Sequence, residues 1–516
     1  MANIQFKALP SNSPSLFPEN ILDRIPLNHP VRLVSQVVDQ LDLEHIIRQY
    51  KGGGTTSFHP RMLIKVLFYA YLSNIYSCRK IERALHENIH FMWLSGNSTP
   101  DYRTINYFRG KRLKGQIQEL FASIVRMLHD MEYVSLKVQY VDGTKIESAA
   151  GRYTFVWKKS IEKNKIKLEA NIASVLSDID AQISRDQSSL GDQQVTDRQL
   201  RKLEDDYLPR LEKYEEQLEV LGDRNSYSKT DTDAVFMRMK EDHMKNGQLK
   251  PAYNTQISTE EQFITHYSIH QTAADTTTLP EHLEGFESHY GKQSESIVAD
   301  AGYGSEQNYE LMEGQGITAF VKYNYFHMEQ KRKDKQDPFS VQNLYYNQQE
   351  DFYVCPAGQK LSFIGHATRV SANGYTAQVS CYQARRCEGC PMRSGCHKAK
   401  GDRLIEVNHR LNKLKDKARE RLLSEEGMYH RSKRPIEVEA VFGQMKSNNR
   451  FTRFTMKGLD KVAVEFGLMA IAHNLRKWAK KWKDKAFIGK PGGKNSLFAI
   501  NQAINMLKST KHRLAA

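Results

Sequence analysis

The sequence has few of the features that mark membrane or secreted proteins. It contains no uncharged apolar run near the roughly 18 residues that a membrane span needs. Residues 1–15 lack an apolar segment behind a basic start, so we do not expect secretion. Six cysteines among 516 residues are too few for a disulfide scaffold and fit a reduced cytosol. A hydrophobic share of 40% can still bury sizeable cores, which predicts a soluble cytoplasmic chain of about two to four domains.

Acidic residues are scarce near the C-terminal end. Residues 446–516 hold 16 Lys and Arg against three Asp and Glu, which is +13 of the chain's total charge of +15. A basic region joined to a nearly neutral body favours a polyanion such as nucleic acid as partner. A solvated, solubilising tail is the alternative. Under the first interpretation, Lys446, Arg450 and Arg453 would lie along phosphate groups.

The first 131 residues have a helical pattern. Apolar residues recur every three or four positions in VRLVSQVVDQLDLEHII and in RMLIKVLFYAYL. The later helix PDYRTINYFRGKRLKG carries Arg103, Arg109 and Arg112. A basic helix in a compact helical domain predicts a reader of DNA ends, and a merely solvated helix face is the alternative.

From residue 136 the pattern changes to strands and helices. SLKVQYVDGTKIE alternates, with Val138, Tyr140 and Asp142 on one face, and predicts a strand. Residues 158–222 are charged with near-heptad apolar spacing, which predicts an inserted antiparallel helical hairpin. The segments that precede and follow this hairpin have the order β, β, β, α, β, α, β. We therefore predict a mixed α/β sheet.

Two aspartates end predicted strands. Asp142 ends an apolar strand and is followed by Gly143, Asp300 ends another and is followed by AGYG, and functional groups gather at such strand ends. Glu439, on the predicted helix PIEVEAVFGQMK, is a third candidate and shares a helix face with Lys446. Glu437 lies about 200° around that helix from Glu439, so only one of the two can face the aspartates. Three carboxylates suit a pair of Mg²⁺ ions, which can serve phosphoryl transfer.

Three other polar residues have structural interpretations. Asp275 in TAADTTTL is a possible fourth carboxylate, but the pattern favours a helix N-cap. His473 and Asn474 lie on an apolar helix, where a hydrogen-bonded core histidine is expected rather than a catalytic one.

The cysteines are concentrated in a polar segment. Cys387, Cys390 and Cys396 lie close together, and Cys355 precedes them. Four thiolates at such spacing can form a tetrahedral structural Zn²⁺ site. Cys381 and His397 are possible substitutes in the ligand set. Reduced structural thiols without metal are the alternative.

The segments YVDGT, VADAGYG and VEAVFGQMK, in that order, resemble the catalytic motifs of DDE-class bacterial insertion-sequence transposases. The similarity is greatest to insertion-sequence family 1182. FHPRMLIKVLFYAYL, SCRKIERAL and PDYRTINYFR resemble the N-terminal helical domain of that family. KTDTDAVFMRMK, AYNTQIS, RFTRFTMKGL and MAIAHNLRKW extend the resemblance over nearly the whole chain.

The resemblance implies a ribonuclease-H-like fold with Asp142, Asp300 and Glu439 as ligands of two Mg²⁺ or Mn²⁺ ions. It implies that Lys446 contacts DNA phosphate. Related transposases carry an Arg shortly before the Glu, and Arg431 and Arg434 lie near that place without matching its spacing. The implied reaction is endonuclease cleavage at the element's terminal inverted repeats and joining of the 3′-OH to target DNA. A homodimer or higher oligomer would bridge two double-stranded ends, near the nucleoid in the cytosol.

The predicted division of the chain follows from these patterns. It consists of an N-terminal helical DNA-end-binding domain (1–131), a core in two parts (132–157 and 223–327), the hairpin (158–222), a cysteine-containing insertion (328–405), core helices (406–482) and a basic tail (483–516). Two alternative functions remain open. The chain could be a nuclease of the same fold that only hydrolyses, or an inactive or domesticated DNA-binding protein.

Overall fold

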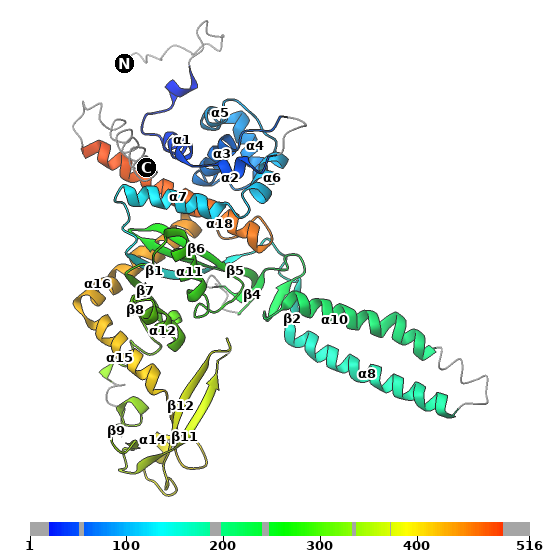
Figure 1. Cartoon of the computed structure of the whole chain (residues 1–516), viewed down its shortest axis with the longest axis vertical. Helices are drawn as coiled ribbons and strands as arrows, with labels where there is room; N and C mark the ends of the chain where they lie inside the picture. Colours follow the sequence, from blue (N-terminus) through cyan, green and yellow to red (C-terminus); the bar gives the residue numbers. More distant parts are fainter. Residues whose placement is uncertain are drawn as a thin grey trace, which may run out of the picture. The chain divides into compact units, whose positions relative to one another are not determined.

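A computed structural model describes residues 20–50, 56–185, 198–239, 247–332, 337–371 and 373–488 (Figure 1). Most of the predicted basic tail, residues 489–516, lies outside the described residues. The contacts divide the chain into two compact units, of which unit 2 is Lys114–Ala470 and unit 1 is the remainder. No helix in the described part of the chain is long and apolar enough to cross a membrane.

Unit 1 is helical. Helices α1 and α3 begin in the same way, because a histidine caps each and a proline occupies the first turn, where its missing N–H costs nothing. Nδ1 of His29 accepts from the Val31 amide (3.2 Å), and Nδ1 of His59 accepts from the Arg61 amide (3.1 Å). The described elements of unit 1 are η1 (Ile21–Arg24), α1 (Pro30–Gln40), α2 (Glu44–Ile47), α3 (Pro60–Leu72), α4 (Cys78–Glu87), α5 (Ile89–Ser95), α6 (Tyr102–Tyr107), the π-helical turn η2 (Phe108–Arg112) and the second part of α18 (Leu459–Ile488).

Unit 2 is built on a mixed sheet of six strands in the order β4-β5-β1-β7-β8, with β6 paired to β5. Strand β5 is antiparallel to β1, β4 and β6, whereas β1, β7 and β8 are parallel. The strands and helices that form this core are β1 (Val138–Glu147), β4 (Val235–Arg238), β5 (Leu249–Glu260), β6 (Phe263–His270), α11 (Leu279–Tyr290), β7 (Ser296–Ala299), η4 (Ala301–Tyr303), α12 (Glu306–Gly314) and β8 (Thr318–Val321). The predicted order of strands and helices and the mixed sheet are confirmed.

Apolar side chains of β1, β7 and β8 pack against helices that follow them in the chain. Val141, Val298 and Phe320 are buried in one cluster with Leu283 of α11 and Leu422 of α15. The helical elements on the C-terminal side are α15 (His409–Leu423), α16 (Glu425–Arg434), the π-turn η6 (Pro435–Glu439), α17 (Ala440–Gly443), the π-turn η7 (Gln444–Asn448) and α18. Helix α7 (Ile117–Asp130), which falls in the predicted N-terminal domain, belongs to unit 2 by its contacts.

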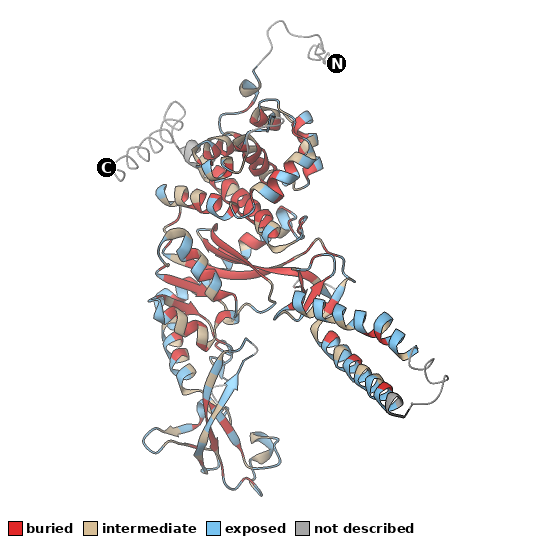
Figure 2. Cartoon of the chain, turned by 45° about the vertical axis from the view of Figure 1, so that its right-hand side comes forward, coloured by how far each residue is buried: buried red, intermediate tan, exposed pale blue. Residues whose placement is uncertain are grey.

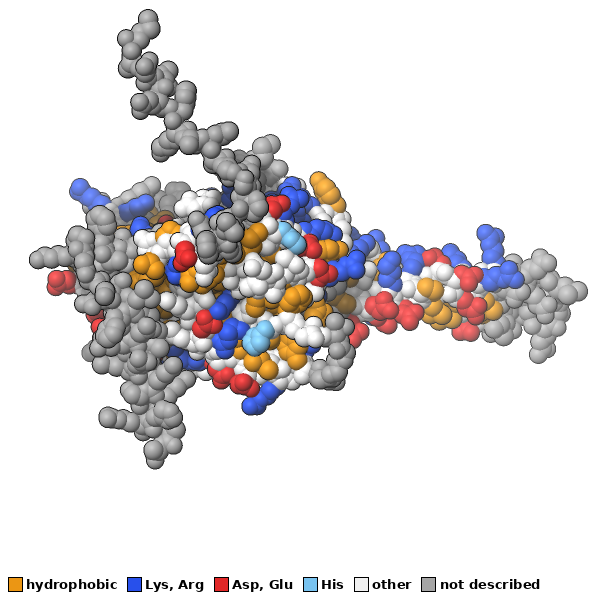
Figure 3. All heavy atoms as spheres, turned by 90° about the horizontal axis from the view of Figure 1, so that it is seen from above, with side chains coloured by type: hydrophobic (Ala, Val, Ile, Leu, Met, Phe, Trp, Pro, Cys, Tyr) orange, Lys and Arg blue, Asp and Glu red, His pale blue; other side chains and the backbone are white. Residues whose placement is uncertain are grey.

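Two helices project from the core as a hairpin (Figure 1). They are α8 (Lys158–Arg185) and α10 (Leu208–Leu221), with the π-turn η3 (Leu203–Tyr207) before α10; at their base the short strands β2 (Phe155–Trp157) and β3 (Ser226–Ser228) pair. Most of the hairpin's surface is exposed, and a narrow apolar seam is buried between the helices (Figure 2). Lys and Arg side chains alternate with Asp and Glu along it (Figure 3), so no single sign of charge dominates there.

The cysteine-containing segment forms a second sheet that the sequence did not predict. Five antiparallel strands follow the order β13-β12-β11-β10-β9 around a small core of their own. The elements are η5 (Val341–Asn343), β9 (Tyr345–Asn347), β10 (Phe352–Val354), β11 (Lys360–Val370), β12 (Thr376–Gln383), α14 (Arg393–Cys396) and β13 (Leu404–Val407). The outer faces of β11 and β12 are exposed (Figure 2), which explains why their sequence is polar.

Candidate active site

Asp142 and Asp300 lie opposite each other on neighbouring parallel strands. Strand β1 pairs with β7 through Tyr140 and Val298, and this register continued by two residues places Asp142 beside Asp300. Asp142 does not end its strand as predicted, because β1 runs on to Glu147; its pairing with β7 stops just before Asp142 instead. Asp300 directly follows β7, and its Oδ1 accepts from the Gly302 amide (2.8 Å).

Glu439 reaches the same place from a helix with an irregular turn. The π-turn η6 closes with a bond from the Ala440 amide to the Pro435 carbonyl, five residues earlier. Such a turn brings side chains five positions apart over one another, which an α-helix does not do. Arg434 and Glu439 therefore share a face, and Arg434 Nη1 lies 3.6 Å from Glu439 Oε1.

Arg434 lies at the centre of the three predicted carboxylates. Its Nη2 is 3.2 Å from Asp142 Oδ2 and 3.7 Å from Asp300 Oδ2. The side chains of Arg434 and Asp142 are buried, with 8% and 10% exposed, whereas Asp300 and Glu439 are about half-exposed. Nε and Nη2 of Arg434 form no hydrogen bond with any described residue. The guanidinium of Arg434 thus stands among three carboxylates, but two of its three nitrogens make no hydrogen bond to the residues that the structure describes.

The donor set suits hard divalent cations. Three carboxylates supply only oxygen ligands, which Mg²⁺ and Mn²⁺ prefer. One arginine balances a third of their charge, and the remaining negative charge would attract a further cation. Within the described residues no three His, Cys, Asp or Glu side chains are close enough to hold an ion, and Arg434 lies among the three predicted carboxylates.

Glu437 points away from this centre. It is buried, and its Oε2 accepts from the Gln262 amide (2.7 Å) while its Oε1 lies 3.9 Å from Lys433. Lys322, which sequence reasoning missed, follows β8 as Asp300 follows β7. Burial and the nearby cations Arg434 and Arg431 lower its pKa, and the charges of Asp300 and Glu439 oppose this shift. Its position directly after an apolar strand was the signal available in the sequence.

Two protein-family models match the chain. One is described as Transposase DDE domain and matches residues 354–479, which include Glu439 but not Asp142 or Asp300. The other is described as Transposase domain (DUF772) and matches residues 19–111, in unit 1. The chain is a DDE-type insertion-sequence transposase. These matches do not distinguish family 1182 from its relatives, and no curated protein and no solved structure matches.

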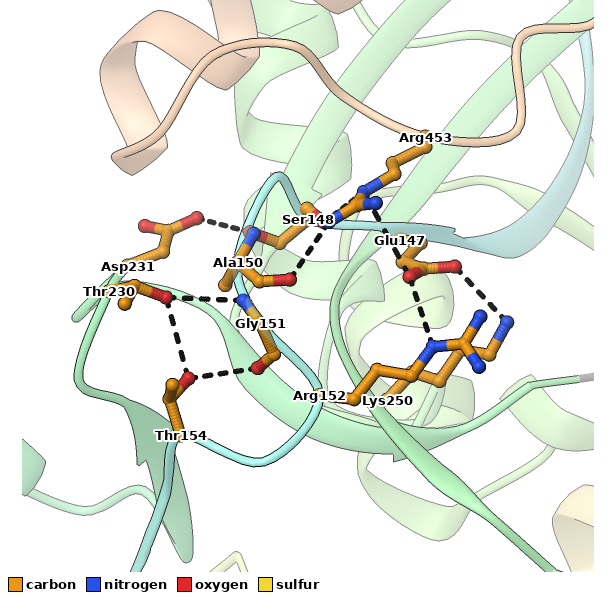
Figure 4. Close-up of polar contacts among 10 residues, drawn as sticks. All are labelled: Glu147, Ser148, Ala150, Gly151, Arg152, Thr154, Thr230, Asp231, Lys250 and Arg453. Carbon is orange, nitrogen blue, oxygen red and sulfur yellow. Dashed lines mark hydrogen bonds and ion pairs between the residues drawn. The ribbon is translucent and has the colours of Figure 1, made fainter.

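The transposase holds its predicted phosphate-contacting residues on the segment after Glu439. Lys446 is on η7, and its Nζ donates to the Lys145 carbonyl (3.1 Å). Arg450 is exposed with a left-handed backbone (φ +56°). Arg453 is half-exposed, and its guanidinium donates to the Ser148 and Ala150 carbonyls, both at 2.9 Å (Figure 4).

Figure 4 shows why Arg453 is fixed in place. Glu147, at the end of β1, lies 3.9 Å from Arg453 Nε, 3.1 Å from Lys250 Nζ and 3.8 Å from Arg152 Nε. Three cations surround one carboxylate, so the cluster carries a net positive charge. Arg431 of the transposase is engaged elsewhere, stacked over Phe326 at 5.0 Å.

The three predicted DNA-reading arginines of unit 1 lie in different environments. Arg103 is exposed on α6 and lies over Tyr102. Arg112 is half-buried over the ring of Tyr50. Arg109 is 4% exposed and donates to the Tyr71 hydroxyl (3.0 Å) and the Tyr76 carbonyl. Its role as a DNA reader stays a prediction, and in this structure its guanidinium, on the π-turn η2, is bonded inside the helical core.

Four cysteines line one cavity. Cys355, Cys387, Cys390 and Cys396 border it together with His397, whereas Cys381 does not. Backbone amides of Gln359 and Arg403 donate to the sulfurs of Cys355 and Cys387, both at 3.3 Å, and Arg403 Nη1 lies 3.2 Å from Cys396 Sγ. All six cysteines are free thiols, and these four are not assembled at metal-binding separations in the described residues. His473 and Asn474 are buried on α18, as predicted for core residues.

Proposed function

We propose that this transposase cuts double-stranded DNA at the terminal inverted repeats of its own insertion sequence and joins the exposed 3′-OH to target DNA. The arrangement of Asp142, Asp300 and Glu439 around Arg434 is the observation that supports this reaction most directly. Two Mg²⁺ or Mn²⁺ ions, when held by these carboxylates, would supply the charge needed to activate an attacking oxygen and stabilise a leaving one. The fold assigned in this proposal is ribonuclease-H-like.

The residues of the chain would divide the work. The sheet positions both aspartates, because Asp142 stands on β1 opposite Ile257 of β5 and Asp300 directly follows β7, whereas Glu439 approaches from a helix. Lys446, seven residues after Glu439, is placed to hold a phosphate next to the carboxylates, since phosphate contacts fix the register of a duplex. Arg450 and the cluster around Glu147 would extend the positive surface along β1.

The remaining parts of the proposal concern the assembly. A homodimer or higher oligomer would bring two element ends together in the bacterial cytosol. The exposed face of α6 with Arg103 would contact those ends. The thiol-lined cavity would hold a structural Zn²⁺ through Cys355, Cys387, Cys390 and Cys396, and this is supported by the cavity's lining and by His397, whose two ring nitrogens have no partner among the described residues.

A strand-transfer assay with end-labelled element termini, target DNA and Mg²⁺ tests the function. Joined products support the proposal. Cut products without joining favour the hydrolytic nuclease, and bound but uncut DNA favours an inactive or domesticated binding protein.

A further inference from the structure

A fourth carboxylate borders the three already described. Asp275 lies in the connection between β6 and α11, and it comes close to two glycines of the site. A β-carbon on Gly143 would lie 2.8 Å from Asp275 Oδ1. A β-carbon on Gly302 would lie 3.0 Å from Asp300 Oδ1 and 3.8 Å from Asp275 Oδ2. Because Gly143 and Gly302 have no side chains, Asp275 can approach Asp142 and Asp300 closely.

The predicted role of Asp275 as a helix N-cap is wrong. The N-cap of α11 is Thr278, and its side chain makes no capping hydrogen bond. The carboxylate of Asp275 instead accepts from Asn254 Nδ2 (2.8 Å) and Gln256 Nε2 (3.0 Å), both through Oδ1. Its second oxygen remains on the side of Gly302 and Asp300.

Two buried amide side chains of strand β5 hold Asp275. Asn254 and Gln256 are 1% exposed or less, and amide side chains are costly to bury unless they are hydrogen-bonded. The hydroxyl of Tyr303 donates to Gln256 Oε1, which turns the amide N–H of Gln256 toward Asp275. Burial raises the pKa of Tyr303 well above its ordinary value, and the charges of Asp275, Asp142 and Asp300 raise it further. The phenol of Tyr303 is thus buried within the electrostatic influence of the three aspartates.

The balance of charge is a separate observation: one guanidinium, that of Arg434, stands among the carboxylates of Asp142, Asp300 and Glu439, and Asp275 adds a further negative charge beside them. Arg434 is 7% exposed and directed into the carboxylates, yet its Nε and Nη2 have no hydrogen-bond partner among the described residues. Two ions about 3.5–4 Å apart, each about 2.1 Å from its oxygens, can contact carboxylates up to about 8 Å apart. Such a span accommodates a carboxylate on either side of Gly302.

We propose that Asp275 is a fourth ligand of the divalent-cation site, contributing Oδ2 while Asn254 and Gln256 hold Oδ1. The proposal rests on the proposed function, since it requires that Asp142 and Asp300 bind ions. It assigns Asn254, Gln256 and Tyr303 as positioning residues that act through Asp275.

The test is a titration of the full-length protein with Mn²⁺. Binding is monitored by the decrease of the free-Mn²⁺ signal in electron paramagnetic resonance. Asp275→Asn keeps the shape and an acceptor for Asn254 but removes the charge. We expect its Mn²⁺ dissociation constant to rise at least about tenfold, as loss of a ligand or its support does at metal sites. Asp416→Asn is the matched control, because Asp416 is an exposed aspartate of α15, and it should bind as the parent does.

The outcomes separate this proposal from the function on which it rests. Weaker binding by Asp275→Asn, with binding abolished in Asp300→Asn, supports both. If Asp275→Asn binds Mn²⁺ with the parental affinity while Asp300→Asn does not bind it, the fourth ligand is overturned and the proposed triad stands. No Mn²⁺ binding by the parent overturns both. If Asp275→Asn does not fold, Asp275→Ser carries the same expectation, because it removes the charge without adding an unsatisfied amide.

Discussion

Arg434 and Glu439 stand five residues apart on one helical run, and the π-turn between them sets Arg434 Nη1 3.6 Å from Glu439 Oε1. The same guanidinium reaches Asp142 and Asp300 on the sheet. A regular α-helix would turn Arg434 and Glu439 to different faces. The extra residue of the turn is therefore what allows one helix to bring both a cation and a carboxylate to the strand ends.

Replacing Arg434 with Gln should destabilise the metal-free protein. The pair Arg434–Asp142 is buried on both sides, and removing one member of a buried pair costs about 3–5 kcal/mol because the other charge is left alone. Mg²⁺ should restore part of the loss by compensating the same carboxylates. The measurement is the melting temperature with and without Mg²⁺. Lys417→Gln is the control, since its pair with Glu313 is exposed and should contribute little. Equal melting temperatures of Arg434→Gln and the parent without Mg²⁺ would contradict the stabilising role of Arg434.

The basic segment after Glu439 should set the salt dependence of DNA binding. Each phosphate contact contributes a log–log slope of about −0.9, so replacing Lys446, Arg450 and Arg453 with Gln should flatten the slope by roughly 2–3 units. Preference for element ends over random DNA should change little, because phosphate contacts do not specify sequence. A salt titration of binding measures both.

The control for that experiment removes equal charge elsewhere. Lys163, Lys167 and Lys213 are exposed on α8 and α10, and replacing them with Gln should leave the slope as in the parent. Sequence preference should respond instead to Arg103→Gln in unit 1. If the Lys446 triple variant keeps the parental slope, its side chains face solvent and the charge there is only solubilising.

Two buried histidines should make unit 2 acid-sensitive. Burial lowers the pKa of His282 to about 3 and that of His266 well below its ordinary value, so both are neutral when folded. An unfolded histidine takes up a proton below about pH 6.5, so stability is present above that pH and falls as the pH drops below it. Each histidine contributes up to about 1.4 kcal/mol per pH unit in this window.

The measurement is the melting temperature between pH 7.5 and 5. His266→Gln removes one of the titrating groups, and its melting temperature should fall less steeply with acid than that of the parent. A parental curve that is flat across this range would show that the two histidines do not govern acid stability.

The sequence predicted the sheet because the relevant signals are local. Alternating and apolar runs marked β1, β5, β6, β7 and β8, and the two helices between them, α11 and α12, were marked by their own sequence patterns. The π-turns were missed because an extra residue in a helix leaves no compositional mark. Two predicted site residues were therefore placed differently from expectation: η2 turns Arg109 inward, and η6 turns Arg434 toward Glu439.

The second sheet and Asp275 were missed for another reason. Strand β11 is largely exposed, and β12 is buried only over the four consecutive residues 379–382, so neither has the apolar alternation of a core strand. TAADTTTL has the composition of a helix start, and only the tertiary approach of Asn254 and Gln256 assigns Asp275 a different role. Contacts between residues about 20 positions apart are not encoded in local periodicity.

The proposed zinc site in the thiol-lined cavity can be tested by metal content. Purified protein should contain about one Zn²⁺ per chain, and Cys387→Ser or Cys390→Ser should lower that content and loosen residues 355–397. Cys381→Ser is the matched control, because Cys381 does not border the cavity. Elemental analysis decides the matter, and undamaged parent without zinc would leave only structural thiols.

The central claim is that Asp142, Asp300 and Glu439 form the metal-binding site of a DNA-cleaving transposase. Its most direct test is cleavage of labelled element ends in Mg²⁺ by Asp142→Asn, Asp300→Asn and Glu439→Gln, with DNA binding measured in parallel. Glu437→Gln is the control, because it stands two residues from Glu439 and Gln keeps an acceptor for the Gln262 amide. The account predicts that all three triad variants bind DNA but do not cut it, while Glu437→Gln cuts as the parent does. Cleavage by any triad variant at the parental rate, or its loss in Glu437→Gln alone, would contradict it.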